Sequence, residues 1–171
     1  AEGLTALYVG CQEGPVACAQ LLRDAGAAAN QADAEGVTPL SIACWKGDAE
    51  IARVLLAANA AINQANVDSE SPLFTACQHN CGECAGLLLE AGAAINQGTN
   101  DGTTPLYVAC QDGQLDCAEL LLKAGAAVDQ ARNTGDTPLI VACQVGHLEV
   151  AKLLSSPGAS RAATPFGTPE E

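Results

Sequence analysis

The chain has 171 residues, of which 49% are apolar and 3% aromatic, and its 20 acidic and 7 basic side chains give a net charge of −13. This charge argues against a nucleic-acid binder, which needs a basic surface for the phosphates. No apolar run approaches the roughly 18 residues that a membrane span requires. The apolar content is too high for intrinsic disorder, so the length predicts one folded domain.

The nine cysteines follow the spacing of a repeat rather than that of a disulfide framework. Five of them stand 33 residues apart, namely Cys11, Cys44, Cys77, Cys110 and Cys143. Their total is odd, and a chain of this length does not need covalent staples. We therefore expect small buried side chains in a reducing compartment. That compartment is expected to be the cytoplasm or the nucleus, or an organelle if a transit peptide has been removed.

Each 33-residue unit carries the signature of a helix start. Thr or Ser recurs at positions 5, 38, 71, 104 and 137, and proline follows it in four of the five units. A hydroxyl at the N-cap and proline at the first helical position favour a helix, such as residues 40–46, which Gly47 ends. A second helix carries clustered leucines, as at 120–122, and closes on a residue that tolerates a left-handed backbone. The closing residues are Gly26, Asn59, Gly92, Gly125 and Gly158.

This unit of turn, helix, turn and helix resembles the ankyrin repeat. The family's T-P-L-x-x-A box appears at residues 38–43 and 104–109, and residues 121–126 resemble its L-L-x-x-G-A segment. The resemblance implies an all-α solenoid of stacked helix-turn-helix units with short β-hairpin-like turns. The expected repeat domain covers residues 1–160, with repeats at about 1–32, 33–65, 66–98, 99–131 and 132–160. Residues 161–171 are expected to form a C-terminal tail or a degenerate capping segment.

Some positions depart from the family's pattern. The usual histidine after T-P-L is replaced in every unit, which puts its recurring hydrogen bond in question. The replacements are Tyr8, Ser41, Phe74, Tyr107 and Ile140. Arg23 and Ser155 stand where the inner units have leucine, and polar faces of this kind favour terminal repeats. The third turn, residues 67–70, lacks glycine and is predicted to be distorted.

No recognisable catalytic motif is present and there are only two histidines, so we expect neither enzyme activity nor a cofactor. Residues 77–84 place three thiols and an imidazole close together, which could suit zinc or redox chemistry. Cys77 and Cys84, however, fall at core positions of the repeat, so we expect no metal site. Cys81 precedes a helix, whose N-terminus is expected to lower the pKa of the thiol.

The candidate binding residues come from the resemblance. In ankyrin-like proteins, the turn tips and the exposed side of the first helix line a concave groove where partners bind. Register places five pairs from the first helices on this groove: Gln12 and Glu13, Trp45 and Lys46, Gln78 and His79, Gln111 and Asp112, and Gln144 and Val145. The turn tips add Glu35, Val37, Asp68, Glu70, Asp101, Thr103 and Asp136.

Two features of this groove have alternative interpretations. Trp45, the single tryptophan, is either a binding anchor or a ring that lies flat on Gln78 and Val37. The glutamines that recur in the first helices contact a partner, or they hydrogen-bond to one another along the row.

Carboxylates dominate the groove and face a single expected basic side chain, Lys46. The acidic residues are Glu13, Glu35, Asp68, Glu70, Asp101, Asp112 and Asp136. A concave surface of one sign steers a partner of the other sign, although the same charges can serve solubility alone.

The expected function is therefore that of a non-catalytic interaction module, an adaptor or scaffold for a protein with a basic surface. Nucleic acid and direct membrane insertion are not expected, and the chain is expected to be monomeric alone or part of a larger complex. The alternatives are a structural subunit of an assembly and a substrate-recruiting or inhibitory domain of a longer protein. A more remote alternative is a thiol redox or zinc protein.

Overall fold

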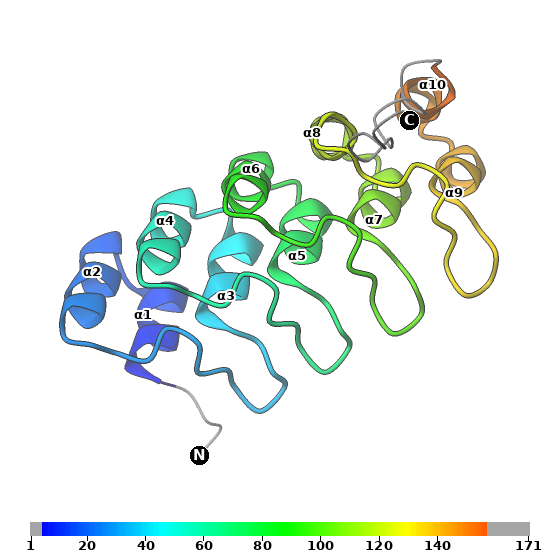
Figure 1. The fold of residues 1–171 in the computed structure, drawn as a ribbon. Coiled ribbons are helices and arrows are strands. Elements are labelled where there is room, and N and C mark those ends of the chain that lie inside the picture. Colours follow the sequence, from blue (N-terminus) through cyan, green and yellow to red (C-terminus); the bar gives the residue numbers. More distant parts are fainter. Residues whose placement is uncertain (1–4, 157–171) are drawn as a thin grey trace, which may run out of the picture.

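The structure is a computed structural model that describes residues 5–156, and ten α-helices within that range form five antiparallel pairs (Figure 1). The helices are α1 (Ala6–Glu13), α2 (Val16–Asp24), α3 (Pro39–Lys46), α4 (Ala49–Ala57), α5 (Pro72–Gln78), α6 (Gly82–Glu90), α7 (Pro105–Gln111), α8 (Leu115–Lys123), α9 (Pro138–Val145) and α10 (Leu148–Ser155). Consecutive pairs stack side by side, so the predicted all-α repeat solenoid is confirmed. The expected tail at 161–171 and the closing residue Gly158 lie outside the described residues.

The first helix of each repeat begins where the hydroxyl residues predict it. Thr104 Oγ1 accepts a hydrogen bond from the backbone N–H of Tyr107 at 3.1 Å, and Pro105 occupies the first turn. The corresponding hydroxyls of the other four repeats cap their helices in the same way. Each cap satisfies a backbone N–H that the helix itself cannot pair, and proline lacks one that would need pairing.

Residues with a left-handed backbone conformation follow the ends of the helices. The predicted closing residues Gly26, Gly92 and Gly125 have φ angles of 77°, 89° and 89°, and Asn59 joins them at 58°. After the first helices, Gly47 and Gly113 take the same conformation at 72° and 71°. Each of these residues reverses the chain so that the next segment can pack against the helix just completed.

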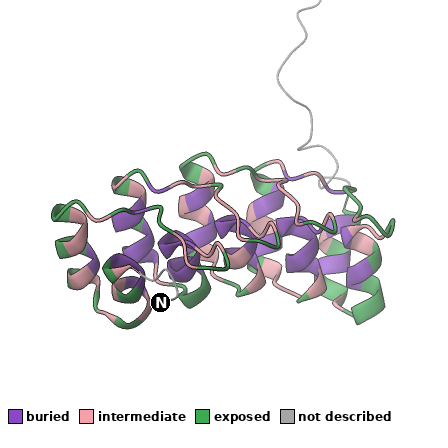
Figure 2. Ribbon diagram, turned by 90° about the horizontal axis from the view of Figure 1, so that it is seen from below, coloured by how far each residue is buried: buried purple, intermediate pink, exposed green. Residues whose placement is uncertain are grey.

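The core runs along the inside of the stack, where purple segments line the facing sides of the helices (Figure 2). The cysteine series contributes to it, because Cys11, Cys44, Cys77 and Cys110 are fully buried. Cys143 is exposed, contrary to the expectation for the whole series, since the described chain stacks no further repeat on α9. All nine cysteines are free thiols.

Hairpin-like turns project beyond the first helices and hydrogen-bond to one another (Figure 1). Within a turn, the Asn66 N–H donates to the carbonyl of Glu70. Between turns, Val67 N–H donates to the carbonyl of Glu35 at 3.0 Å, and the next two turns repeat this bond. The prediction that the third turn is distorted is wrong, because Ser69 takes the left-handed φ of 64° that glycine has in the other turns.

No helix within residues 5–156 is both long and apolar enough to cross a membrane.

Candidate functional site

The turns and first helices line two neighbouring cavities that are open to solvent. One, here called the Arg132 pocket, has a volume of about 380 Å³ and lies between the third, fourth and fifth repeats. The other, the Trp45 pocket, has a volume of about 290 Å³ and lies between the first three repeats. Glu70 and Gln78 line both. The groove that register predicts is therefore hollowed at two adjacent places.

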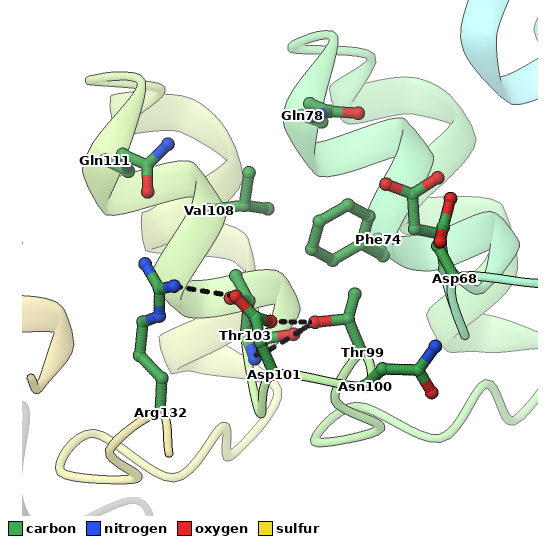
Figure 3. Close-up of a pocket in the computed structure, with 11 residues that line it drawn as sticks. Asp68, Phe74, Gln78, Thr99, Asn100, Asp101, Thr103, Val108, Gln111 and Arg132 are labelled. Atoms are coloured by element: carbon green, nitrogen blue, oxygen red, sulfur yellow. Dashed lines mark hydrogen bonds and ion pairs between the residues drawn. The ribbon is translucent and has the colours of Figure 1, made fainter. Parts of the chain in front are cut away.

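The Arg132 pocket combines an apolar wall with polar turn residues (Figure 3). Phe74 on α5 and Val108 on α7 form the wall, and the Arg132 side chain reaches toward them from the fifth turn. The remaining lining residues are Asp68, Glu70, Gln78, Thr99, Asn100, Asp101, Thr103 and Gln111. Three successive turns and two helices meet here, so the pocket depends on the stacking of the repeats.

Asp101 is used inside the fold. Its Oδ1 accepts hydrogen bonds from Thr99 and from Thr103, whose N–H and Oγ1 lie at 3.1 and 2.7 Å. Its Oδ2 lies 2.7 Å from Nη2 of Arg132. The hydrogen bonds from Thr99 and Thr103, together with the Arg132 charge, hold the pKa of Asp101 at about 2.

Arg132 corrects the expectation that Lys46 is the only basic side chain of the groove. Its guanidinium lies 5.3 Å from the centre of the Tyr107 ring, at a distance typical of cation–π contacts. The pair is separated by 25 residues, and so is another pair, Tyr8 and Asp33, in which the phenol donates to Oδ2 at 2.9 Å. Burial and this bond raise the pKa of Tyr8 to about 12.

These contacts locate the residues that sequence reasoning missed. In both pairs the position that usually holds histidine in the family touches the first residue of the next turn. A search at a spacing of 25 residues, in addition to 33, would have drawn attention to Tyr8, Asp33, Tyr107 and Arg132.

Thr103 requires a correction of another kind. Its side chain was expected at an exposed turn tip, but the residue is buried and its hydroxyl donates to Asp101. The burial follows from the turn geometry, which points Thr103 inward to hold the Asp101 carboxylate. It therefore supports the turn and offers no exposed hydroxyl.

Trp45 is the largest side chain that lines the second cavity. Its side chain is 53% exposed, and its ring meets His79 edge-on, with centroids 6.1 Å apart and an angle of 83° between the planes. Gln78 and Val37, the neighbours expected beneath the ring, line the same pocket. The other lining residues are Tyr8, Gln12, Asp33, Glu35, Ser41, Ile42, Asn66, Glu70 and Thr75.

The carboxylates around the Trp45 pocket differ in how many hydrogen bonds they accept from other residues of the chain. Asp33 accepts hydrogen bonds from the backbone of Glu35 and Val37 as well as from Tyr8. Glu70 accepts one from the Asn66 amide at 2.7 Å. The Glu35 side chain makes no hydrogen bond or ion pair within residues 5–156. Glu35, and in part Glu70, thus keep acceptor oxygens that an incoming donor can use.

The other expected contact residues lie along the same rows but outside these two linings. They are Glu13, Lys46, Asp112, Asp136, Gln144 and Val145. The Lys46 ammonium donates to the backbone carbonyl of Gln12, and Asp136 accepts from Thr134. Among the described residues no hydrogen bond joins two of the first-helix glutamine amides, so the alternative of a mutually bonded glutamine row is not observed.

The thiol cluster at 77–84 is mostly enclosed by the fold, and a hydrogen bond with Cys44 lowers the pKa of Cys84 inside the core. Cys77 and Cys84 are fully buried, whereas Cys81 is half-buried. The predicted lowering of the Cys81 pKa is wrong: burial, followed by the charges of neighbouring thiols, raises it. In the part of the chain that the structure describes, no three His, Cys, Asp or Glu side chains are grouped to hold a metal ion.

Comparison with known proteins accords with this architecture. A family model described as ankyrin repeats (3 copies) matches residues 1–66, 58–131 and 73–163. No curated protein matches the chain. Ankyrin repeats generally serve as protein–protein interaction modules and are typically non-catalytic. With its capped helix pairs, its row of turns and these overlapping matches, the chain belongs to the ankyrin-repeat family.

Proposed function

We propose that this chain is a non-catalytic binding module that holds a basic protein segment in the groove of turns and first helices. The observation that carries the proposal is Trp45, a half-exposed indole in a cavity whose rim bears carboxylates that are not fully paired. Large aromatic side chains in pockets are the usual centres of binding energy at interfaces. An exposed indole beside carboxylates that lack a partner offers apolar contact and negative charge to the same cationic segment.

The electrostatics of the groove favour a basic partner. Asp101 is offset by Arg132, but Glu35, Asp68 and Asp112 make no side-chain ion pair within the described chain. Basic residues on the second helices instead pair locally, as Arg53 does with Glu50 and Glu83. The negative field is therefore less compensated on the groove than on the second helices, which is the arrangement that steers a cationic segment to it.

Partner capture from a cell extract at low and moderate salt, identified by mass spectrometry, tests the proposal. The parent chain, Trp45→Ala and Leu148→Ala serve as baits; Leu148 is also exposed but lies in α10, outside both pockets. We expect the parent chain to capture a basic protein that moderate salt releases. The Trp45→Ala bait should lose this protein, because the substitution is expected to weaken binding by about 2 kcal/mol or more. The Leu148→Ala bait should capture as the parent does.

Other outcomes would contradict the proposal. Capture that survives both salt and Trp45→Ala would indicate a structural subunit held by another face. Equal loss with Trp45→Ala and Leu148→Ala would mean that exposed apolar side chains matter without regard to the groove. Thermal unfolding of both variants should stay close to that of the parent, because each side chain is more than half exposed.

A further inference from the structure

We infer that the Trp45 pocket is a recognition site for a single arginine side chain of the partner, an assignment that rests on the proposed function and narrows it. The cavity of about 290 Å³ is at the small end of ligand sites. It therefore suits one long side chain rather than a cofactor. Its lining supplies one aromatic wall, a partly apolar floor at Val37 and Ile42, and an acidic rim.

The rim favours a cation. Asp33, Glu35 and Glu70 all line the pocket, and within the described chain no lysine or arginine is among its lining residues. Lys46 follows Trp45 in the chain but lies outside the pocket lining, and its ammonium is bound to the backbone carbonyl of Gln12. Because Asp33 already accepts three hydrogen bonds within the fold, Glu35 and Glu70 carry most of the free acceptor capacity.

Guanidinium fits this arrangement better than ammonium. Glu35 and Glu70 come from adjacent turns, which the bond from Val67 N–H to the Glu35 carbonyl holds in register. A planar group with donors on several edges can bond both carboxylates while its face stacks on the indole. An ammonium group presents a compact, strongly hydrated charge and gains less from the aromatic wall.

The adjoining pocket is less suited to a guanidinium group from a partner, although Asp68 and Glu70 also line it. Arg132 already provides a fixed guanidinium there, paired with Asp101 and stacked near Tyr107. A second guanidinium in that pocket would meet like charge.

The test uses N-acetyl-arginine amide as the probe and N-acetyl-citrulline amide as its neutral counterpart of the same shape. Trp45 is the single tryptophan, so its fluorescence reports on the pocket directly. We expect saturable change with a Kd of about 1–10 mM for the arginine probe, as its few heavy atoms allow. The citrulline probe should bind about tenfold more weakly, because it lacks the charge.

Matched variants separate pocket recognition from general attraction. Glu35→Gln and Glu90→Gln each remove one negative charge, but Glu90 ends α6 and lines neither pocket. We expect Glu35→Gln to weaken arginine binding about three- to tenfold and Glu90→Gln less than twofold. Circular dichroism melting of both variants verifies that each is folded.

The assignment is overturned if the two probes bind equally, if neither causes a saturable change up to about 50 mM, or if the two variants weaken binding equally. The proposed function fails separately, when the partner capture described above proves insensitive to salt and to Trp45→Ala. Salt- and Trp45-dependent capture combined with equal binding of the two probes would keep the basic partner and remove the arginine site.

Discussion

Asp101 stands at an exposed turn tip, yet its carboxylate is committed to holding the turn together. It receives bonds from Thr99, Thr103 and Arg132, and these bonds hold its pKa at about 2, below the ordinary 3.8. A carboxylate used in this way is a poor contact for an incoming basic group, because a partner would have to compete with Arg132. At the residue scale, exposure alone therefore does not distinguish a binding carboxylate from a structural one.

The lowered pKa gives a stability difference that depends on pH. Because the fold favours ionised Asp101, its contribution is fully present above pH 4 and is lost as the pH falls from about 4 to about 2. We expect Asp101→Asn to lower the free energy of unfolding at pH 7 by about 1 kcal/mol, since the half-exposed group is screened by solvent. Urea unfolding of parent and variant between pH 7 and pH 2 measures this difference.

The difference should shrink toward zero at the acid end of that range. Asp129→Asn is the control, because that exposed carboxylate has no side-chain partner among the described residues. A constant difference between parent and Asp101→Asn at every pH would show that the carboxylate charge contributes nothing.

At the scale of the element, the turns depend on how closely successive backbones approach. Gly102 has φ of 84°, and a Cβ there would lie 3.1 Å from the backbone nitrogen of Asn133 in the next turn. Gly135 occupies the same place one repeat later with φ of 91°, but no described atom lies within 4 Å of its Cβ position. Both glycines therefore need a positive φ angle, but only at Gly102 would an added Cβ be crowded by neighbouring atoms.

This pair separates the cost of conformation from the cost of packing. We expect Gly135→Ala to destabilise the chain by about 1–2 kcal/mol, the cost of a left-handed alanine. Gly102→Ala should cost at least about 1 kcal/mol more, because the turns must also move apart. Chemical denaturation of both variants gives the comparison. If both variants lose the same free energy of unfolding, the turns can move apart at little cost.

At the scale of the whole molecule, the acidic groove should act mainly on the rate of association. Asp68→Lys combined with Asp112→Lys reverses two charges that the described fold does not pair. We expect slower association with the captured partner and a flatter dependence on salt, with little change in dissociation. Stopped-flow measurements at several ionic strengths provide the test. Glu90→Lys with Asp129→Lys, outside the two pockets, is the matched control. Unchanged rates in the groove variant would mean that the acidity serves solubility.

The repeat and its helix starts were predictable because their causes are local. A hydroxyl cap followed by proline, as at Thr104 and Pro105, needs no knowledge of the rest of the chain. The pairing of Tyr107 with Arg132 was not predictable in this way, because it arises only when one repeat stacks on the next. The same holds for the burial of Thr103. Register located the groove, whereas the engagement of each side chain depended on contacts between turns.

The hydrogen bonds between neighbouring turns have a consequence for motion. The N–H groups of Val67, Asn100 and Asn133 lie in solvent-facing loops, yet each donates to a carbonyl of the preceding turn. Their exchange with deuterated solvent requires two loops to separate, so it should be slow compared with that of ordinary loop amides. The row of turns then behaves as one rigid unit. A ligand that seats in it loses its own freedom on binding but imposes little further ordering on the receptor.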